Sequence, residues 1–511
     1  MNVPEKCKPI YTGNLNHPPL DDTYIHMAIG KHFALNGIWG ISSSGFSSST
    51  SSPLWTLLIG LGYRLFGVNA WLPAVLGLLS GSFTIILLFA LLKQIRDSLR
   101  LTLFLVGILL FAPLPILALS GMEHTLHALL TVWLLYTVLP LADDGEVPPQ
   151  QVALMLILAG LLTMTRYEGL FLIFAVSLLL LFLKRFVLAV LVGAAGFLPV
   201  LVYGLYSVRQ GWYFLPNSIL LKGKIPDPSM QGVLGLLFQI PSALSKAPHI
   251  SLLLVACLVV YLWGEERKLV GRRERVLIAL FAVITFLHLQ FASLGWFYRY
   301  EAYLVLTGSV ILADLMNLLM SSSPQNVQGR GPVSYVAVAI LGFLVILPLA
   351  VRTGFAFRDY PLAVMNIHEQ QVQIGLFVKQ NYTGKSIAAN DIGAISYLAD
   401  VALLDLFGLG SLDVAEAKRD DVFDREKIDE LVQHHEVDLV VIYNSWFEDK
   451  IPASWVEIGQ WQISNNVISS SDTVSFYAPT PAQQSTIIGQ LQDFSSQLPA
   501  DVAQFGLYQT P

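Results

Sequence analysis

Residues 186–206 read FVLAVLVGAAGFLPVLVYGLY and contain no charged side chain. A helix needs about 20 apolar residues to cross the hydrocarbon core of a bilayer, and this run supplies them. Other apolar runs precede and follow it, and tilt or flanking residues can extend those that are shorter. The sequence predicts about ten membrane-spanning helices, in the runs 71–92, 101–119, 124–140, 151–165, 168–183, 186–206, 250–263, 276–295, 302–320 and 334–351.

The composition agrees with a membrane protein of several spans. Of the 511 residues, 54% are hydrophobic and 13% are charged, whereas roughly a quarter of an average soluble domain is charged. The formal net charge is −6, and Lys and Arg occur in short clusters between apolar runs. This distribution argues against nucleic acid as a partner. Cys7 and Cys257 are the two cysteines, and the second lies inside an apolar run, which excludes a disulfide framework.

The orientation follows from the basic segments. The run 53–67 is short and contains Arg64, so we expect an interfacial or half-inserted helix there. The basic connections then fall on one side, which the positive-inside rule makes cytoplasmic: 93–100, 184–185 and 264–275. The opposite, extracytoplasmic side receives residues 1–70, the loop 207–249 and everything after residue 351.

The last third of the chain differs from the rest. After residue 351 no run approaches spanning length, and strand-like stretches alternate with helical ones such as 424–435. This alternation is typical of a small α/β domain, with strands at 386–390, 401–406, 438–443 and 473–479. Its glycines do not form the G-x-G-x-x-G fingerprint, so a nucleotide-binding role has no support.

The predicted fold class is therefore mostly α. It is a polytopic transmembrane helical bundle with interfacial helices and a C-terminal extracytoplasmic α/β domain. The predicted domains are an extracytoplasmic acidic loop with interfacial helices at 1–70, the bundle at 71–351, and the α/β domain at 352–511.

Charged and polar side chains gather on the predicted extracytoplasmic side. That compartment lacks soluble nucleotides, so an enzyme there must take its activated group from a membrane-borne donor such as a polyprenyl phosphate. The reaction needs a carboxylate that accepts a proton from the attacking hydroxyl and cations that hold the departing phosphate. Both types of side chain are present, among Asp21, Asp22, Glu123, His124, Arg166, Glu168, Lys222, Lys224, Arg299 and Glu301.

Several motifs occur in an order that resembles the C-type glycosyltransferase superfamily. After the Asp21-Asp22 pair they read SSPLWTLLIGLGYRLFG (51–67), LSGMEHTLHALL (119–130), MTRYEGLFL (164–172), LPNSILLKGK (215–224), YRYEAYL (298–304) and AANDIGAISYLADVALLDLFGLG (388–410). Members of the superfamily are integral membrane enzymes that use polyprenyl-phosphate-linked sugars. They include the protein mannosyltransferases and the aminoarabinose and arabinofuranosyl transferases.

The resemblance implies roles for individual residues. Asp21 matches the general base, and Asp22 a supporting carboxylate and candidate ligand of a divalent metal. The residues nearest the donor phosphate are Lys222, Lys224 and Arg299, and those at the rim of the cavity are Glu123 and Arg166. The implied reaction transfers a sugar with inversion to a hydroxyl of a glycan, lipid or protein, at a bacterial inner or plasma membrane.

One departure from the family pattern concerns the N-terminus. The family has a transmembrane helix before the acidic loop, and residues 1–20 contain neither a spanning run nor the apolar core of a signal peptide. We expect a truncated gene model as the explanation.

Simpler roles compete with these assignments. An Asp before a helix is a common N-cap, which would account for one residue of the Asp21-Asp22 pair. The basic residues Lys222, Lys224 and Arg299 could snorkel to an interface. His124 and His127 lie one helical turn apart, and we expect helix-packing hydrogen bonds there rather than half a metal site. The competing functions are a transporter or flippase of lipid-linked sugars and a relative that binds such lipids without turnover.

Overall fold

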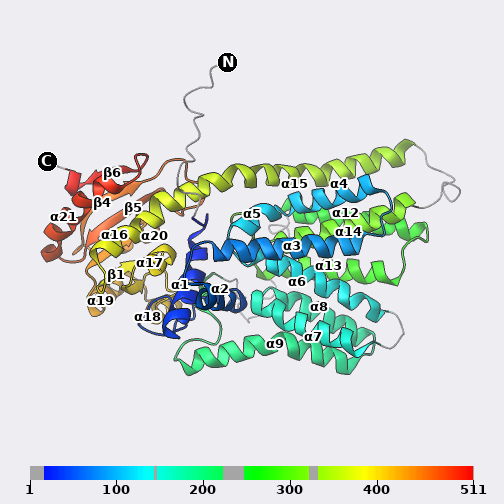
Figure 1. Cartoon of the computed structure of the whole chain (residues 1–511), viewed down its shortest axis with the longest axis horizontal. Coiled ribbons are helices and arrows are strands. Elements are labelled where there is room, and N and C mark those ends of the chain that lie inside the picture. Colours follow the sequence, from blue (N-terminus) through cyan, green and yellow to red (C-terminus); the bar gives the residue numbers. More distant parts are fainter. Residues whose placement is uncertain (1–16, 143–146, 223–244, 246, 322–331, 510–511) are drawn as a thin grey trace, which may run out of the picture. The chain divides into compact units, whose positions relative to one another are not determined.

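The computed structural model describes residues 17–142, 147–222, 245, 247–321 and 332–509 (Figure 1). The chain forms two compact units. The helical unit consists of Thr50–Trp55 and Ala74–Phe357. The sheet unit consists of Met1–Ser49, Thr56–Pro73 and Arg358–Pro511, so it combines the beginning of the chain with its end.

The helical unit is built from apolar helices. Helices α7, α8 and α9 pack side by side, and α14 packs against α4, α6 and α12 (Figure 1). The helices are α3 (Leu72–Leu92), α4 (Ser98–Phe111), α5 (Leu114–Leu119), α6 (His124–Val138), α7 (Pro149–Thr165), α8 (Gly169–Phe182), α9 (Phe186–Arg209), α10 (Asn217–Lys222), α12 (Pro248–Glu266), α13 (Arg272–Phe291), α14 (Ala302–Ser321) and α15 (Pro332–Ile367).

Seven helical segments in the described part of the chain are long and apolar enough to cross a membrane. Three shorter apolar helices, α4, α7 and α8, coincide with further predicted runs. The chain is thus an integral membrane protein, and the number of crossings stays a prediction. The predicted run 101–119 is two helices, α4 and α5, because Pro113 and Pro115 cannot continue a helix begun before them.

The helices differ in how much of their surface other helices cover. In the most apolar window of α6 and of α14, 72% of the residues are buried, against 28% in α3 and 22% in α9. Helices α6 and α14 are therefore central to the unit. The exposed faces of α3 and α9 carry large apolar side chains such as Phe83, Ile86 and Val190, as expected of helices that contact lipid.

The sheet unit contains one six-stranded mixed sheet with strand order β2-β1-β3-β5-β4-β6. β2, β1 and β3 are parallel, and the other pairings are antiparallel. The strands are β1 (Ser386–Ala389), β2 (Ala402–Asp405), β3 (Leu439–Ile442), β4 (Val456–Gln462), β5 (Thr473–Ala478) and β6 (Ala503–Gly506). The four predicted strands correspond to β1, β2, β3 and β5. The predicted fold class, a mostly helical membrane protein with a C-terminal α/β domain, is confirmed, and the side of the membrane on which that domain lies stays a prediction.

The helices of the sheet unit come from both ends of the chain. Helix α17 connects β1 to β2, and α18 and α19 connect β2 to β3, as parallel strands require. These helices are α1 (Asp21–Asn36), α2 (Pro53–Phe66), α16 (Gln373–Asn381), α17 (Gly393–Leu398), α18 (Leu412–Arg419), α19 (Arg425–His434), α20 (Asn444–Phe447) and α21 (Gln484–Phe494).

An aromatic cluster joins the antiparallel half of the sheet to α16 and α21. Phe377 is fully buried, and its ring centroid lies 5.7 Å from that of Trp461, 5.7 Å from that of Phe476 and 5.5 Å from that of Phe494. Rings in such edge-to-face contact contribute beyond the area they bury. Phe377 thus connects one strand pair to two helices.

Replacement of Phe377 by Ala should destabilise the sheet unit by about 3–5 kcal/mol, because it leaves a cavity among packed rings. The measurement is denaturant unfolding of the full-length protein in detergent, with hydrogen exchange of β4 and β5 to localise the effect. Phe505→Ala is the control, since Phe505 is 50% exposed in the same sheet. An unchanged unfolding midpoint in Phe377→Ala would contradict this account of the core.

Candidate functional site

Asp21, the first residue of α1, binds the amino-terminal end of α17. Its Oδ2 accepts the N–H of Gly393 at 2.6 Å, and its Oδ1 accepts the N–H of Ala394 at 2.8 Å. The first N–H groups of a helix have no partner within the helix and carry the positive end of the peptide dipoles. The buried Asp21 carboxylate is therefore oriented through both of its oxygens.

The capping alternative for Asp21 is wrong. Helix α1 begins at Asp21 itself, and its N-cap is Leu20, which makes no side-chain capping bond. Asp21 instead satisfies N–H groups that lie 372 and 373 residues further along the chain.

Position 393 has room for glycine alone. A Cβ atom there would lie 2.1 Å from the carbonyl oxygen of Asp21 and 2.6 Å from its Oδ2. Side-chain atoms do not approach backbone atoms so closely, and the backbone of α1 cannot move without losing the two hydrogen bonds. Gly393 thus permits the approach of α1 to α17.

A second carboxyl group, Asp391, lies beside Asp21, and their side chains are hydrogen-bonded to each other. Asp391 Oδ2 also accepts hydrogen bonds from Gln371 Nε2 and from the Tyr443 hydroxyl, each at 3.0 Å. Burial and the negative charge of Asp391 raise the pKa of Asp21 well above its usual range. Gln371 belongs to a π-helical turn, His368–Val372, a feature that often occurs at functional sites.

The groups that surround the Asp21 carboxylate are backbone N–H donors and a second carboxyl group. Both Asp21 oxygens accept N–H groups, and the nearby Asp391 is within hydrogen-bonding distance. Asp22, the next residue of α1, is half-buried. In the described part of the chain, no three His, Cys, Asp or Glu side chains are grouped so that they could hold a metal ion. We derive no step that passes through a metal.

In the helical unit, Arg166 connects two carboxylates. Its Nη1 donates to Glu123 Oε1 at 2.6 Å, and its Nη2 donates to Glu168 Oε1 at 2.6 Å. Arg166 Nε also donates to Glu168 Oε2 at 3.1 Å, so Glu168 is bound through both of its oxygens. Glu123 is fully buried and Arg166 nearly so. The two predicted rim residues are therefore in direct contact within the unit.

Arg299 belongs to the same neighbourhood through Tyr300. The Tyr300 ring centroid lies 5.0 Å from the Arg299 guanidinium carbon and 5.5 Å from that of Arg166. Two guanidinium groups thus share one aromatic ring, and Arg299 is 2% exposed.

The backbone just before Arg299 has an unusual conformation. Gly295, Trp296, Phe297 and Tyr298 have φ values of 78°, 40°, 56° and 61°. A left-handed conformation costs roughly 1–2 kcal/mol for each residue that has a side chain. Strain of this kind persists where surrounding contacts impose it, and it concentrates at functional sites.

A large apolar groove lies between α4, α12, α14 and α15 of the helical unit. Its volume is about 860 Å³, and almost all of its lining is apolar. At the end formed by Phe111 and Leu349, Arg352 Nη1 donates a hydrogen bond to the carbonyl oxygen of Phe111 at 3.2 Å. The groove therefore runs along four helices and ends beside a buried cation.

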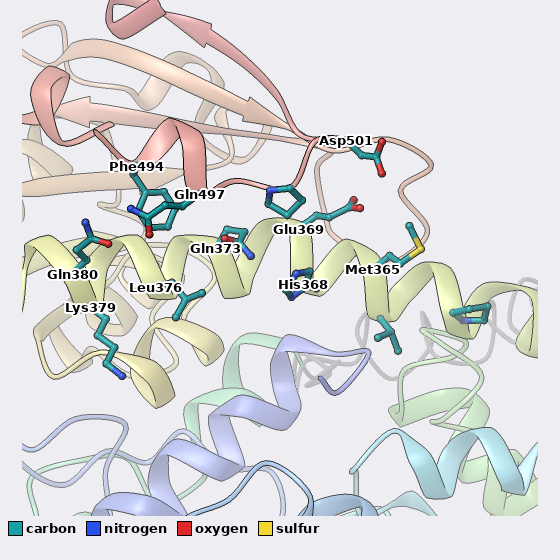
Figure 2. Close-up of a pocket in the computed structure, with 13 residues that line it drawn as sticks. Met365, His368, Glu369, Gln373, Leu376, Lys379, Gln380, Phe494, Gln497 and Asp501 are labelled. Atoms are coloured by element: carbon teal, nitrogen blue, oxygen red, sulfur yellow. The ribbon is translucent and has the colours of Figure 1, made fainter. Parts of the chain in front are cut away.

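The sheet unit has a groove of its own, of about 810 Å³, between the helical segment 361–380 and residues 494–501. Figure 2 shows the Glu369 and Asp501 carboxylates near each other, between Gln373 and Met365 along the groove. Glu369 and Gln373 are almost fully buried, and the amides of Gln380 and Gln497 also line the groove. The lining thus offers carboxylates and amides next to apolar surface.

The predicted phosphate-binding residues Lys222 and Lys224 lie where one described segment of the chain, 147–222, ends. Lys222 is the last residue of α10, a six-residue helix. Lys224 lies outside the described residues. The structure brings Glu123, Arg166 and Arg299 together in the helical unit, and it describes Asp21 and Asp22 in the sheet unit.

Sequence analysis missed the partners of the predicted residues. Asp391 and Gly393 lie inside a quoted motif, AANDIGAISY, yet no role was predicted for either. His127 and His288 contact Tyr303, the first with ring centroids 4.6 Å apart and the second through a hydrogen bond of 3.1 Å. The ring contact agrees with the packing role expected of His127, although it is not the hydrogen bond that was predicted.

Gly393→Ala should separate α1 from α17 and destabilise the sheet unit by about 1–3 kcal/mol, because the added methyl group overlaps the Asp21 backbone. Thermal unfolding of the full-length protein in detergent measures this change. Gly489→Ala is the matched control: Gly489 lies in α21 with nothing near its Cβ position, so alanine should leave stability equal or slightly higher. Equal unfolding temperatures for the two variants would refute the close approach.

Comparison with known proteins supplies one partial family match and two matches of fold. A family model described as a domain of unknown function (DUF8728) covers residues 365–477. No curated protein matches the sequence. Two crystal structures of ArnT from Cupriavidus metallidurans align over 92% of this chain and 95% of ArnT: the apo state with a TM-score of 0.54 and 14% identity, and the complex with undecaprenyl phosphate with 0.52 and 13%. The chain therefore has the fold of the ArnT structures, in agreement with the fold that the resemblance of its motifs implied.

Proposed function

We propose that the protein is a membrane glycosyltransferase that moves a sugar from a polyprenyl-phosphate donor to an acceptor hydroxyl on the extracytoplasmic face, with inversion. The observation that carries the proposal is the buried Asp21 carboxyl of raised pKa, held by a helix terminus in a chain with this fold. The proposed extracytoplasmic orientation of the sheet unit is supported by the basic connections between the apolar runs. The proposed location in a bacterial plasma membrane is what the resemblance of the motifs implies.

Asp21 is the proposed general base. The acceptor oxygen forms a bond to the anomeric carbon while the bond from that carbon to the phosphate oxygen breaks, and the electron pair leaves with the lipid phosphate. Asp21 accepts the hydroxyl proton. Its raised pKa makes it a stronger base than an exposed Asp, and the two N–H groups of α17 fix its orientation. Asp22 is the proposed supporting carboxylate.

Arg299, with Lys222 or Lys224, is the proposed site for the donor phosphate. Departing phosphate needs positive charge that is in place before the bond breaks. The polyprenyl chain would occupy the apolar groove of the helical unit, whose length and lining suit a long hydrocarbon. The match to an ArnT structure that contains undecaprenyl phosphate supports this class of donor.

The acceptor is proposed to bind to the sheet unit. The groove in Figure 2 offers carboxylates and amides, which hydrogen-bond to hydroxyl groups, beside apolar surface. A glycan, a lipid headgroup or a protein side chain each meets this description.

A transporter or flippase of lipid-linked sugars is the second candidate. The buried network of Arg166 with Glu123 and Glu168 favours it, since ionisable groups inside helical membrane proteins often mark a transport path. Movement of fluorescent lipid-linked sugar across vesicles, without release of lipid phosphate, would support this candidate over the transferase. A relative that binds the lipid without turnover would show neither movement nor release.

Asp21→Asn should reduce transfer on the order of 10²–10⁴-fold while donor binding persists, because a neutral amide cannot accept the proton. The assay is transfer from a panel of radiolabelled polyprenyl-phosphate sugars by purified protein in nanodiscs. Asp400→Asn is the control, since Asp400 is exposed in the same unit and bonds to the Ser43 hydroxyl. Loss of folded Asp21→Asn protein equal to the loss of transfer would remove the catalytic assignment.

The Asp391→Asn variant should shift the pH dependence of transfer to lower pH. Ionised Asp21 is the active base, so transfer rises with pH through its pKa. The variant removes the negative charge by which Asp391 raises the pKa of Asp21, and its amide N–H can donate to the ionised carboxylate, so ionisation occurs at lower pH. Profiles of kcat/KM for the wild type, Asp391→Asn and the exposed control Asp493→Asn test this shift. An unmoved or raised acidic limb in Asp391→Asn contradicts the pairing of the two carboxyls.

A further inference from the structure

The left-handed turn Gly295–Tyr298 directly precedes Arg299. All four residues have positive φ, and three of them are Trp296, Phe297 and Tyr298, whose large side chains disfavour that conformation. Left to themselves, Trp296, Phe297 and Tyr298 would adopt negative φ values, and the left-handed turn would be lost. Contacts from outside it must hold it in place.

Glu301 is hydrogen-bonded to the first residue of the turn. Its Oε2 accepts the N–H of Gly295 at 3.0 Å. Its Oε1 lies 3.1 Å from Arg352 Nη2 and 3.4 Å from His249 Nε2. One carboxylate thus links the first residue of the turn to α15 and to the start of α12.

Arg352 is hydrogen-bonded to the last residue of the turn. Its Nη2 donates to the carbonyl oxygen of Tyr298 at 2.5 Å, and its guanidinium carbon lies 5.5 Å from the Tyr298 ring centroid. Its Nη1 donates to the carbonyl oxygen of Phe111 in α4. The side chains of Arg352 and Glu301 are 6% and 2% exposed, so water does not compete for these bonds.

We propose that the Arg352–Glu301 ion pair is a positioning device: it holds residues 295–298 left-handed and thereby orients Arg299 toward the lipid phosphate. This inference rests on the proposed function, in which Arg299 binds that phosphate. Arg352 and Glu301 themselves act through the backbone of the turn. Neither was assigned a role from the sequence.

A purely structural ion pair would behave differently. Its loss would lower the stability of the helical unit, with phosphate binding reduced only in proportion to folded protein. A positioning pair, in contrast, contacts backbone groups at both ends of one turn, so its loss changes the orientation of Arg299 in a protein that remains folded. Lipid-phosphate binding per folded molecule separates the two roles.

The first test uses undecaprenyl phosphate as the probe, with full-length protein in nanodiscs. Arg352→Gln and Glu301→Gln should each weaken binding about tenfold, the effect of losing one charge-assisted hydrogen bond to the ligand. Arg299→Gln should weaken it as much or more, and the Arg299→Gln/Arg352→Gln double variant should match Arg299→Gln alone. Arg358→Gln is the matched control, since Arg358 lies in the same helix and pairs with Asp359 at 62% side-chain exposure.

A second-site variant tests the backbone conformation itself. Glycine adopts positive φ without strain and alanine does not. Trp296 is 47% exposed, so its side chain contributes little packing. In the Arg352→Gln background, Trp296→Gly should therefore restore part of the lost binding, and Trp296→Ala should not.

The outcomes separate this inference from the proposed function. Failure of the wild type to bind undecaprenyl phosphate refutes the proposed donor. The ion pair is then tested by hydrogen exchange of residues 295–301, which should become faster in Arg352→Gln and slower again on addition of Trp296→Gly. Wild-type binding together with unchanged binding by folded Arg352→Gln overturns the inference, and so does equal rescue by Trp296→Gly and Trp296→Ala.

Discussion

The bond between the Asp21 carboxylate and the amino end of α17 positions α1 within the sheet unit. That bond fixes where α1 begins relative to the parallel strands, because α17 is the connection between β1 and β2. It also decides which side chains surround the carboxyl: Asp391 two residues before Gly393, and through Asp391 the Gln371 amide and the Tyr443 hydroxyl. A buried carboxylate without such donors would carry a large desolvation cost. The same contacts that stabilise the fold therefore set the chemistry of Asp21.

In the helical unit, buried charged side chains are stabilised by opposite charges. Buried charged side chains are paired in small sets: Arg166 lies between Glu123 and Glu168, and Glu301 lies beside Arg352. Pairing is what makes such burial tolerable, since removal of one partner leaves an uncompensated charge. Arg166 and Arg299 also share the Tyr300 ring, so the two guanidinium groups are held without direct contact between them. The apolar faces along the rest of these helices are left to contact each other or lipid.

Much of the fold could be predicted because lipid imposes a simple rule on composition. The predicted span 186–206 corresponds to α9, which ends three residues later, at Arg209. The short strands β1, β2, β3 and β5 were also predicted from their apolar residues. Strands β4 and β6 escaped prediction, since β4 mixes Glu457, Gln460 and Gln462 with its apolar residues and β6 is a short edge strand. Asp21 was named as a candidate site residue because of its neighbours in the sequence.

The partners of Asp21, namely Asp391, Gly393 and Ala394, could not be predicted, because they lie hundreds of residues further along the chain. The left-handed turn was hidden for a different reason: Trp, Phe and Tyr do not indicate positive φ.

The pairing of α1 with α17 also constrains the order in which the protein can be made. The ribosome synthesises α1 first and Gly393 only after every helix of the helical unit has been translated. Contacts between residues so distant in the chain form late and close a very long loop. While the membrane helices insert, Asp21 and the rest of α1 cannot yet contact α17, because α17 has not been synthesised. The sheet unit thus completes its assembly last, and a folded sheet unit reports that the helices between its two parts have already been produced.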